Sequence, residues 1–512
     1  MSTPSIDLTD AIAHDSRGSL RPAEACAIFI FGASGDLARR KLIPALCELA
    51  AQQCLARHFA IVGFARTPMS DDAFRDSAAQ AVRKYSGGGA IDEARLRDFL
   101  QWFTYVSGDY ASPEAFQRLN ARAQELDRQY HLEGNRLYYL ATPPEVYPQV
   151  IGQLGKAQMA RGQDEKSWTR IIVEKPYGRD LATARQLNRA VLEVFDEWQV
   201  YRIDHYLGKD TVQNLLVLRF GNGIFEPLWN RNYVDHVQIT AAESLGVETR
   251  AAFYENTGAL RDMIQSHVLQ LTSLAALEPP SAFDATAVRN EKIKLLQAIR
   301  PFTAETARRD VVRGQYGPGT VGGEQVRGYR QEPRVRADSS TETFVAARLA
   351  IDNWRWADVP FYIRTGKRLA RGVSEVAIQF RRAPHLVFRG HDLDANALVL
   401  NVQPEDGISI CFHAKVPGPD MRLKDVSMEF SYRAEFGGRH SAYSTLINDC
   451  MRGDATLFDR ADGLEAAWAL VDPILQAWRG GDAAVPTYAA GSWGPRESDA
   501  LLERDGRRWR KP

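Results

Sequence analysis

The sequence contains the run Ala25-Cys-Ala-Ile-Phe-Ile-Phe31, which leads directly into Gly32-Ala-Ser-Gly35-Asp-Leu-Ala38. The apolar run is typical of a strand buried on both faces. A helical pattern follows from Arg39 into the fifties. Glycines at such a turn let the backbone approach a pyrophosphate, and the start of the helix supplies free N–H groups. Although Gly-x-x-Gly alone also fits a structural turn, its place between a strand and a helix predicts a dinucleotide-binding site.

The next apolar run favours NADP as the dinucleotide. This second strand, Phe59-Ala-Ile-Val-Gly-Phe-Ala65, ends in Arg66-Thr67. An NAD site usually has an acidic residue here for the ribose hydroxyls, whereas an arginine suits a 2′-phosphate. The alternative is that Arg66 is only a solvated charge at a strand end. We therefore expect NADP, with NAD as a poorer alternative.

Strand and helix patterns alternate as far as residue 204. Strands are predicted at 102–106, 137–141, 170–173 and 200–203, and helices near 72–85, 112–129, 145–160 and 180–195. This alternation indicates an α/β Rossmann-like domain with a mostly parallel sheet, whose ligands lie at the carboxyl ends of the strands. We expect a flexible arm over 1–23, the dinucleotide-binding domain over 24–204 and a second domain over 205–512.

The second domain has a different pattern. Helices are predicted at 211–220 and 255–276, with a strand at 235–241 between them. The Gly- and Arg-rich segment 312–336 is interpreted as a long loop. Strands then follow one another without intervening helices, and two helices end the ordered chain. This order predicts an α+β domain with a large, mainly antiparallel sheet. The predicted strands are 344–352, 359–365, 375–382, 396–402, 407–415 and 425–432, and the last helices are 442–453 and 464–479.

Composition excludes several classes of protein. Lys+Arg and Asp+Glu are equal at 64 each in the 512 residues, so there is no basic excess of the kind that a general nucleic-acid binder carries. The five cysteines form no CxxC pair, which argues against a disulfide framework and a metal cluster. The N-terminus has no signal-peptide pattern, and no apolar run reaches the about 20 residues of a membrane span. A cytoplasmic protein without nucleic-acid or membrane partners is expected.

The stretch Tyr201-Arg-Ile-Asp-His-Tyr-Leu-Gly-Lys209 combines cations, a carboxylate, an imidazole and phenols after a predicted strand. His205 in this stretch and His267, which lies near Arg261 and Asp262, are the histidines with polar neighbours in the sequence. The other eight are interpreted as having no polar surroundings: His14, His58, His131, His236, His385, His391, His413 and His440.

These residues fit a proton transfer from an alcohol. A neutral imidazole is a suitable base, and a carboxylate on its other nitrogen fixes the tautomer and stabilises the imidazolium. Asp204 or Asp262 could be that carboxylate, because spacing does not choose between them. Lys175 in Glu174-Lys-Pro-Tyr-Gly178 could hydrogen-bond the reacting hydroxyl, or be a surface lysine before a turn. Lys209 and Lys367 are further cations, each of which could equally be solvated.

Five motifs together resemble the glucose-6-phosphate 1-dehydrogenase family and occur in the family's order over about residues 25 to 480. They are Gly32-Ala-Ser-Gly-Asp-Leu-Ala38, Glu174-Lys-Pro-Tyr-Gly178, Arg202-Ile-Asp-His-Tyr-Leu-Gly-Lys209, Arg261-Asp-Met-Ile-Gln-Ser-His267 and Val359-Pro-Phe-Tyr-Ile-Arg-Thr-Gly-Lys367. The resemblance implies NADP-dependent oxidation of D-glucose 6-phosphate at C1 to 6-phospho-D-glucono-1,5-lactone, the first step of the oxidative pentose phosphate pathway. It also implies dimers or tetramers.

The resemblance further implies a role for each matching residue. His267 would be the general base, Asp204 its orienting carboxylate and Lys175 a contact of the cofactor and of the sugar near the reacting carbon. The Lys175–Pro176 bond would be cis. The remaining residues implied are substrate-binding His205, Tyr206, Lys209, Glu243, Asp262 and Lys367, and cofactor-binding Gly32, Ser34, Gly35, Asp36, Leu37 and Arg66.

Two departures from the family pattern are visible. Tyr177 stands where members usually have Phe, and Gly372-Val373 replace an Arg-Lys pair that binds a second, structural NADP in some members. The second departure argues against such a second site. Two other readings stay open: a catalytically silent sensor of sugar phosphate or NADP, and an enzyme for another hexose 6-phosphate or free glucose. The cations at His205 and Lys209 make free glucose the weaker substrate.

Overall fold

The structure, a computed structural model, describes residues 22–86, 92–162, 164, 166–385, 387–388, 393–437, 441–479 and 484–512. The arm expected over 1–23 lies almost wholly outside these residues. The chain divides into two compact units. The first consists of Met1–Ala141, Lys156–Arg170 and Ile447–Gly453, and the second of Thr142–Gly155, Ile171–Leu446 and Asp454–Pro512.

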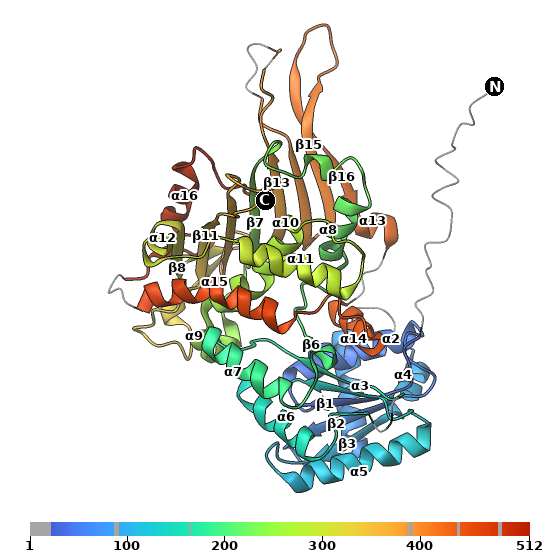
Figure 1. The fold of residues 1–512 in the computed structure, drawn as a ribbon. Helices are drawn as coiled ribbons and strands as arrows, with labels where there is room; N and C mark the ends of the chain where they lie inside the picture. Colours follow the sequence, from blue (N-terminus) through green and yellow to red (C-terminus); the bar gives the residue numbers. More distant parts are fainter. Residues whose placement is uncertain are drawn as a thin grey trace, which may run out of the picture. The chain divides into compact units, whose positions relative to one another are not determined.

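The first sheet has six strands in the order β3-β2-β1-β4-β5-β6 (Figure 1). The pairings of β1 with β2 and β4, of β2 with β3 and of β5 with β6 are parallel, as the alternation of strands and helices predicts. The strands are β1 (Ala27–Phe31), β2 (Ala60–Ala65), β3 (Phe103–Ser107), β4 (Arg136–Leu140), β5 (Thr169–Val173) and β6 (Val200–Arg202). The intervening helices are η1 (Ala38–Leu42), α2 (Ile43–Ala51), α3 (Asp71–Tyr85), α4 (Glu93–Leu100), α5 (Pro113–Tyr130), α6 (Tyr147–Lys156) and α7 (Leu181–Leu192).

Aromatic side chains fill the core of the first unit. Phe31 of β1 stacks on Phe116 of α5 with ring centroids 5.9 Å apart, and Phe64 of β2 packs at 5.4 Å from the same ring. All three side chains are fully buried. Pairs of this kind add to the stabilisation that burial alone provides. The continuous apolar strands of the sequence are therefore covered by helices, as a parallel sheet requires.

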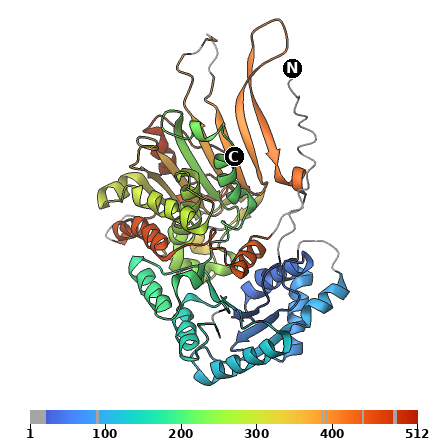
Figure 2. The same ribbon diagram turned by 45° about the vertical axis from the view of Figure 1, so that its right-hand side comes forward.

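The second sheet lies in the second unit and has nine strands in the order β16-β15-β14-β13-β7-β12-β11-β8-β17 (Figures 1 and 2). It is mainly antiparallel, as expected. However, β7 lies between β13 and β12 and pairs with β12 in parallel, so the sheet is not a simple meander. The strands are β7 (Val234–Ala242), β8 (Val311–Gly317), β11 (Phe344–Leu349), β12 (Phe361–Gly366), β13 (Val373–Phe380), β14 (Ala397–Gln403), β15 (Gly407–Lys415), β16 (Leu423–Ser431) and β17 (Thr487–Ala489).

The helix expected over 255–276 is three consecutive elements. These are α9 (Ala251–Ala259), the π-helix η6 (Leu260–Val268) and α10 (Leu269–Ala276), and η6 packs against β7, β11 and β12. The π-helix places the Arg261-to-His267 motif directly on the sheet. The other helices from residue 205 onward are α8 (Asp210–Phe220), α11 (Ala285–Ala298), α12 (Ala304–Asp310), α13 (Tyr432–Phe436), α14 (Ala442–Arg452), α15 (Ala461–Arg479) and α16 (Arg496–Glu503).

Two expectations about the second domain are wrong. The segment 312–336 is not a long loop, because it contains most of β8, the hairpin β9 (Gly319–Val321) and β10 (Glu324–Val326), and a 3-10 turn. The ordered chain does not end at 479, since β17 and α16 follow and Trp509 is buried. Both segments are poor in apolar residues and are ordered by pairing with β11 and β8, which is a tertiary effect that local composition does not reveal.

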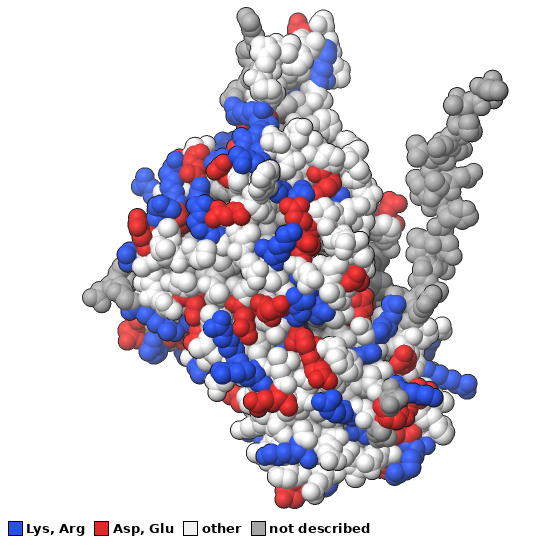
Figure 3. Space-filling model, in the orientation of Figure 1, with Lys and Arg blue, Asp and Glu red and all other residues white. Residues whose placement is uncertain are grey.

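The surface carries both signs of charge. On the face shown in Figure 3, Lys and Arg side chains are interspersed with Asp and Glu. That face therefore shows no continuous basic stripe of the kind that nucleic-acid binding requires. Within the described part of the chain, no helix is long and apolar enough to cross a membrane.

Candidate active site

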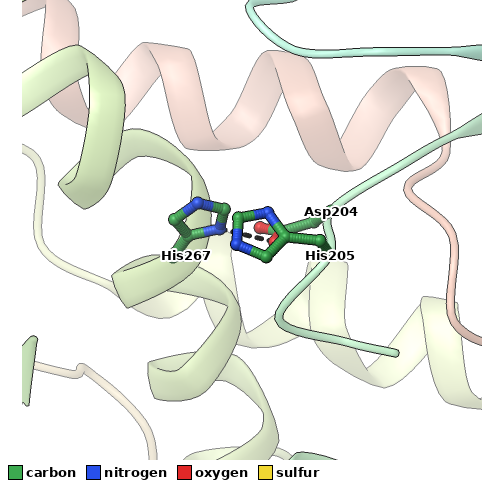
Figure 4. Close-up of side chains that lie close together, drawn as sticks. All are labelled: Asp204, His205 and His267. Carbon is green, nitrogen blue, oxygen red and sulfur yellow. Dashed lines mark hydrogen bonds and ion pairs between the residues drawn. The ribbon is translucent and has the colours of Figure 1, made fainter. Parts of the chain in front are cut away.

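His267 and Asp204 form a buried hydrogen-bonded pair (Figure 4). His267 Nδ1 lies 2.5 Å from Asp204 Oδ1, and the two side chains are 1% and 3% exposed. His267 comes from η6, and Asp204 follows the end of β6. A carboxylate at Nδ1 keeps the proton there and leaves Nε2 with its lone pair. Of the two aspartates that spacing left open, Asp204 is the one that contacts the imidazole ring.

Lys175 contacts the other nitrogen of this imidazole. Its Nζ lies 2.6 Å from His267 Nε2, 3.1 Å from Asp262 Oδ1 and 2.8 Å from the Asp262 carbonyl oxygen. Because β5 and β6 pair in parallel, with Val173 beside Arg202, Lys175 and Asp204 follow the carboxyl ends of neighbouring strands. Ligands of such sheets bind at this edge. The Lys175–Pro176 peptide bond is cis, as the resemblance implied.

The π-helix explains why Asp262 and His267 reach the same ammonium group. A π-helix bonds residue i to residue i+5, so residues five apart lie one above the other. In an α-helix they would be about 140° apart around the axis. The element begins after Gly258, whose φ is 68° and ψ is 172°. Glu342 accepts a hydrogen bond from the Leu260 N–H at 3.0 Å, so its carboxylate stabilises the start of η6.

Burial and charge set the protonation of the pair. Burial lowers the pKa of His267, and the nearby Lys175 lowers it further, while Asp204 opposes both. Burial disfavours the charge of Asp204, yet the interaction with His267 holds the pKa of this carboxyl well below its usual value. The same balance holds for Asp262, whose pKa the Lys175 and Lys367 ammonium groups lower despite burial. A neutral His267 between charged partners is the form that can accept a proton.

His205, Tyr206 and Lys209 lie next to this pair. The Tyr206 ring stacks on the His267 ring with centroids 4.2 Å apart, and the His205 ring meets it edge-on at 4.5 Å. Lys209 Nζ lies 4.3 Å from the centre of the Tyr206 ring and donates to the Gln403 side-chain oxygen. Burial, together with the neighbouring His267 and Lys175, lowers the pKa of His205 well below its ordinary value.

A second ion pair joins Glu243 and Lys367. Lys367 Nζ lies 2.6 Å from Glu243 Oε2, and the lysine side chain is 9% exposed against 35% for the glutamate. Ala242 and Gly366 are paired neighbours on the parallel strands β7 and β12, so Glu243 and Lys367 follow two adjacent carboxyl ends. The pair therefore offers an acceptor and a donor for hydroxyl groups.

The cluster of Asp204, His205 and His267 also has the spacing of a metal site, since one ligand atom from each lies within 4.8 Å of the others. Two contacts favour proton chemistry instead. His267 Nδ1 is held by Asp204, and Nε2 faces the Lys175 ammonium group. A cation at that position repels a metal ion, and it donates a hydrogen bond to the Nε2 lone pair.

The glycine turn after β1 fits a dinucleotide. Gly32 has a φ of 86°, and a Cβ at Gly35 would meet the Gly32 carbonyl oxygen at 3.0 Å. The Ser34 and Thr67 hydroxyls lie 3.3 Å apart beside the exposed Arg66, whose guanidinium lies 5.9 Å from the Tyr110 ring centre. Close backbone approach, hydroxyl groups and a cation match the needs of a phosphate-rich ligand. Asp36 pairs with Arg40 at 3.4 Å, and Leu37 is half-buried.

Other residues near the site gave no signal in the sequence. Tyr443 stacks parallel to His205 at 6.2 Å between centroids, and its pKa is raised by burial and by the adjacent Glu174. Ser374 Oγ lies 3.1 Å from the Tyr206 hydroxyl. Tyr443 and Ser374 lie far in the sequence from His205 and Tyr206, and neither belongs to a recognisable motif. Two histidines were also misjudged, because His236 contacts Asp235 and His413 contacts Asp425, each at 2.7 Å. His14, His391 and His440 lie outside the described residues.

The parallel sheet with its glycine turn and the buried His–Asp pair define a dehydrogenase with a Rossmann-like domain for a nicotinamide dinucleotide. Family models agree, because residues 29–214 match the glucose-6-phosphate dehydrogenase NAD binding domain and residues 216–510 match the C-terminal domain. The chain belongs to the glucose-6-phosphate dehydrogenase family.

Individual relatives match over nearly the whole chain. The chain is 46% identical over 495 residues to glucose-6-phosphate 1-dehydrogenase of Aggregatibacter actinomycetemcomitans, covering 96% of this chain and 98% of that protein. It is 45% identical over 496 residues to glucose-6-phosphate 1-dehydrogenase 2 of Mycobacterium tuberculosis, covering 96% of each. A solved glucose-6-phosphate dehydrogenase in complex with its substrate glucose-6-phosphate matches with a TM-score of 0.87 and 34% identity, covering 96% of this chain and 100% of that one. The Mycobacterium avium enzyme matches with a TM-score of 0.81 at 34% identity, covering 96% and 99%.

Proposed function

We propose that this chain oxidises D-glucose 6-phosphate at C1 to 6-phospho-D-glucono-1,5-lactone with NADP, the first step of the oxidative pentose phosphate pathway. The observation that carries the proposal is the buried imidazole of His267, held by Asp204 at Nδ1 and facing Lys175 at Nε2. A silent sensor would have no use for an oriented base.

His267 Nε2 accepts the proton of the C1 hydroxyl, and Asp204 stabilises the imidazolium that results. Lys175 donates a hydrogen bond to the same oxygen and so holds it against the base. A nicotinamide dinucleotide, when bound, would supply the acceptor for the hydride that leaves C1. Lys175 Nζ lies 2.6 Å from His267 Nε2, so the substrate oxygen replaces this hydrogen bond and the two nitrogens move apart to admit it.

The polar residues around the pair bind the sugar phosphate in this proposal. His205, Tyr206 and Lys209 contact the phosphate, where charge-assisted hydrogen bonds are strong. Glu243, Asp262 and Lys367 bind the hydroxyl groups. A phosphate dianion also favours the protonated form of His205, whose pKa is low in the free protein. Binding of the distant phosphate positions C1 for reaction.

The glycine turn binds the cofactor in the same proposal. Gly32, Ser34, Gly35, Asp36 and Leu37 would hold the pyrophosphate, Arg66 would bind the 2′-phosphate of NADP, and Lys175 would bind the cofactor near the reacting carbon. The exposed Arg66 guanidinium, with no acidic residue closing β2, supports NADP over NAD.

We further propose that the chain forms a homodimer or homotetramer through the sheet around β14 to β16. The strand β16 is the last strand of its sheet, and Met428 and Phe430 on it are 63% and 36% exposed. An edge strand with exposed apolar side chains is a ready surface for pairing. Light scattering of the purified protein tests this proposal, and a monomer at micromolar concentration would contradict it.

Two other proposals concern the organisation and location of the chain. Domains over 24–204 and 205–512 are supported by the family models, which meet near residue 215 between the ranges 29–214 and 216–510. A cytoplasmic location is supported by the five cysteines, each of which is a free thiol.

The test of the activity follows reduced cofactor by absorbance, with NADP or NAD and with glucose 6-phosphate or glucose. Rapid reduction with glucose 6-phosphate and NADP is the expected result. Reduction that is as fast with glucose as with glucose 6-phosphate would contradict the proposed phosphate site. Binding of both ligands without any reduction would favour the sensor.

A further inference from the structure

A small pocket of about 30 Å³ borders the Asp204 carboxylate. Its lining includes Asp204, Gln265, Gln270, Asp459, Tyr177 and Leu464. All of these residues belong to the second unit. The proposed proton transfer uses only Oδ1 of Asp204, so it gives no role to the groups around Oδ2.

Five polar atoms of the lining residues are buried without a hydrogen-bond partner among the described residues. Two of them, Tyr177 Oη and Arg202 Nε, belong to side chains that contact each other, with the guanidinium 5.2 Å from the ring centre. The other three are Asp204 Oδ2, Gln265 Nε2 and Gln270 Oε1. The three residues are 3%, 6% and 4% exposed. Buried polar atoms in folded proteins are nearly always hydrogen-bonded to protein or to ordered water, because leaving one unpaired costs free energy.

The chemistry of these atoms matches a single water molecule. Gln270 Nε2 donates to both Asp459 oxygens, at 2.8 and 2.9 Å. If the amide were flipped, Gln270 Oε1 would face the Asp459 carboxylate, and neither group could donate a hydrogen bond. Gln270 Oε1 is therefore an acceptor, as is Asp204 Oδ2, while Gln265 Nε2 is a donor. A water molecule can donate to the two acceptors and accept from the one donor. The pocket exceeds the about 10–15 Å³ that one water needs.

We propose that a structural water in this pocket links Asp204 to Gln265 and Gln270, and that these two glutamines are positioning residues for the Asp204–His267 pair. The effect on turnover rests on the proposed function. Through Gln270 the network continues to Asp459, which Lys292 Nζ contacts at 3.1 Å from a side chain that is 5% exposed. A buried ion pair therefore anchors the far end of the chain of hydrogen bonds.

The water has two consequences for the base. It fixes the plane of the Asp204 carboxylate, so that Oδ1 stays directed at His267 Nδ1. It also donates a hydrogen to Oδ2, which draws negative charge away from Oδ1 and weakens the stabilisation of the imidazolium. Removing it should lower turnover through loss of orientation and should raise the pKa of the base.

Gln265→Leu keeps the size of the side chain and removes the amide that holds the water. We expect kcat to fall by about tenfold, as for the loss of a hydrogen bond near a charged group, with KM for glucose 6-phosphate within about twofold. The acid limb of the kcat/KM profile should move to higher pH by about half a unit. Gln265→Asn, which keeps an amide and leaves room for a second water, should restore most of both values. Gln297→Leu, at an exposed position of α11, is the matched control and should change neither.

A crystal structure of the wild-type protein at a resolution that shows ordered water tests the site without any activity. Density within hydrogen-bond distance of Asp204 Oδ2, lost in Gln265→Leu, is the expected result. An absence of that density in the wild type would overturn the proposal, even if Gln265→Leu failed to fold. So would a Gln265→Leu enzyme with wild-type kcat and pH profile. Wild-type protein that holds the water but reduces no cofactor would refute the proposed function and leave the water site standing.

Discussion

Asp262 and His267, five residues apart in η6, both contact the Nζ atom of Lys175. This contact depends on the π-helical geometry, because an α-helix would turn one of the two side chains away from the lysine. The same ammonium group thus links the proposed base to a proposed ligand of the sugar hydroxyls. The start of η6, rather than the motif itself, fixes the spacing of these groups.

Gly258→Ala should therefore damage both stability and activity. Gly258 has a φ of 68°, and an added Cβ would lie 2.3 Å from Glu342 Oε1, the atom that accepts the Leu260 N–H. We expect a loss of about 2–4 kcal/mol in the free energy of unfolding and a lower kcat in the protein that remains folded. Gly152→Ala in α6, where a Cβ meets nothing within 4 Å, is the control and should be neutral or stabilising. Equal effects of the two substitutions in thermal melts would refute the role of Gly258.

His267→Asn tests the base. The amide cannot accept a proton at neutral pH, so kcat should fall by about 10²–10⁴-fold while both ligands still bind, as measured by calorimetry. His413→Asn is the control. His413 lies in β15, where it contacts Asp425 at 2.7 Å, and it takes no part in the proposed proton transfer. A His267→Asn enzyme with wild-type turnover would remove His267 from the mechanism.

The pH dependence follows from the protonation of the same imidazole. Protonated His267 cannot act as a base, so kcat/KM should fall as the pH drops through its pKa. Because burial lowers that pKa, the wild-type acid limb should lie below pH 6.5, the ordinary value for histidine. Asp204 raises the pKa of His267, so Asp204→Asn should move the limb to still lower pH and also reduce kcat by about 10²–10⁴-fold through loss of the tautomer. A limb that moves to higher pH would contradict this assignment of charges.

The sequence predicted the elements whose pattern is local. The strands β1 to β6 and the glycine turn were predicted because continuous apolar runs and helical periodicity alternate there. The partners of His267 could be proposed from the family motifs, but spacing alone left Asp204 and Asp262 equivalent. That choice depends on the neighbouring ends of β5 and β6 and on the π-helical turn, which are properties of the folded chain.

The wrong predictions have the same physical origin. The segment 312–336 looks like a loop because its few apolar residues, among them Tyr316, are separated by glycines and arginines. Its strand β8 forms through pairing with β11 and with β17, which lies more than a hundred residues away in the sequence. Trp509 near the C-terminus is buried in the same way, against Tyr362 and Arg364. Contacts of this range leave no periodic signal in a single sequence.

Lys209→Met tests the phosphate site. Loss of a charge-assisted hydrogen bond of about 1.5–3 kcal/mol should raise KM for glucose 6-phosphate by about 10–100-fold, with a smaller change in kcat. Any slow turnover of free glucose should be unaffected, because that substrate has no phosphate. Lys294→Met, at an exposed lysine of α11, serves as the control. Equal losses with both sugars would show that Lys209 supports the fold rather than the phosphate.

Arg66→Ala tests the choice of dinucleotide. Arg66 is exposed at the end of β2 beside the Ser34 and Thr67 hydroxyls, and within the described residues its guanidinium rests only near the Tyr110 ring. If it binds the 2′-phosphate, its removal should raise KM for NADP by about 10–100-fold and leave KM for NAD within about twofold, because NAD has no phosphate at that position. Arg57→Ala, at an exposed arginine of the same unit, should change neither value. Initial rates with each cofactor give the comparison directly. Parallel increases for NADP and NAD would mean that Arg66 does not contact the 2′-phosphate, and that the preference must come from another part of the turn.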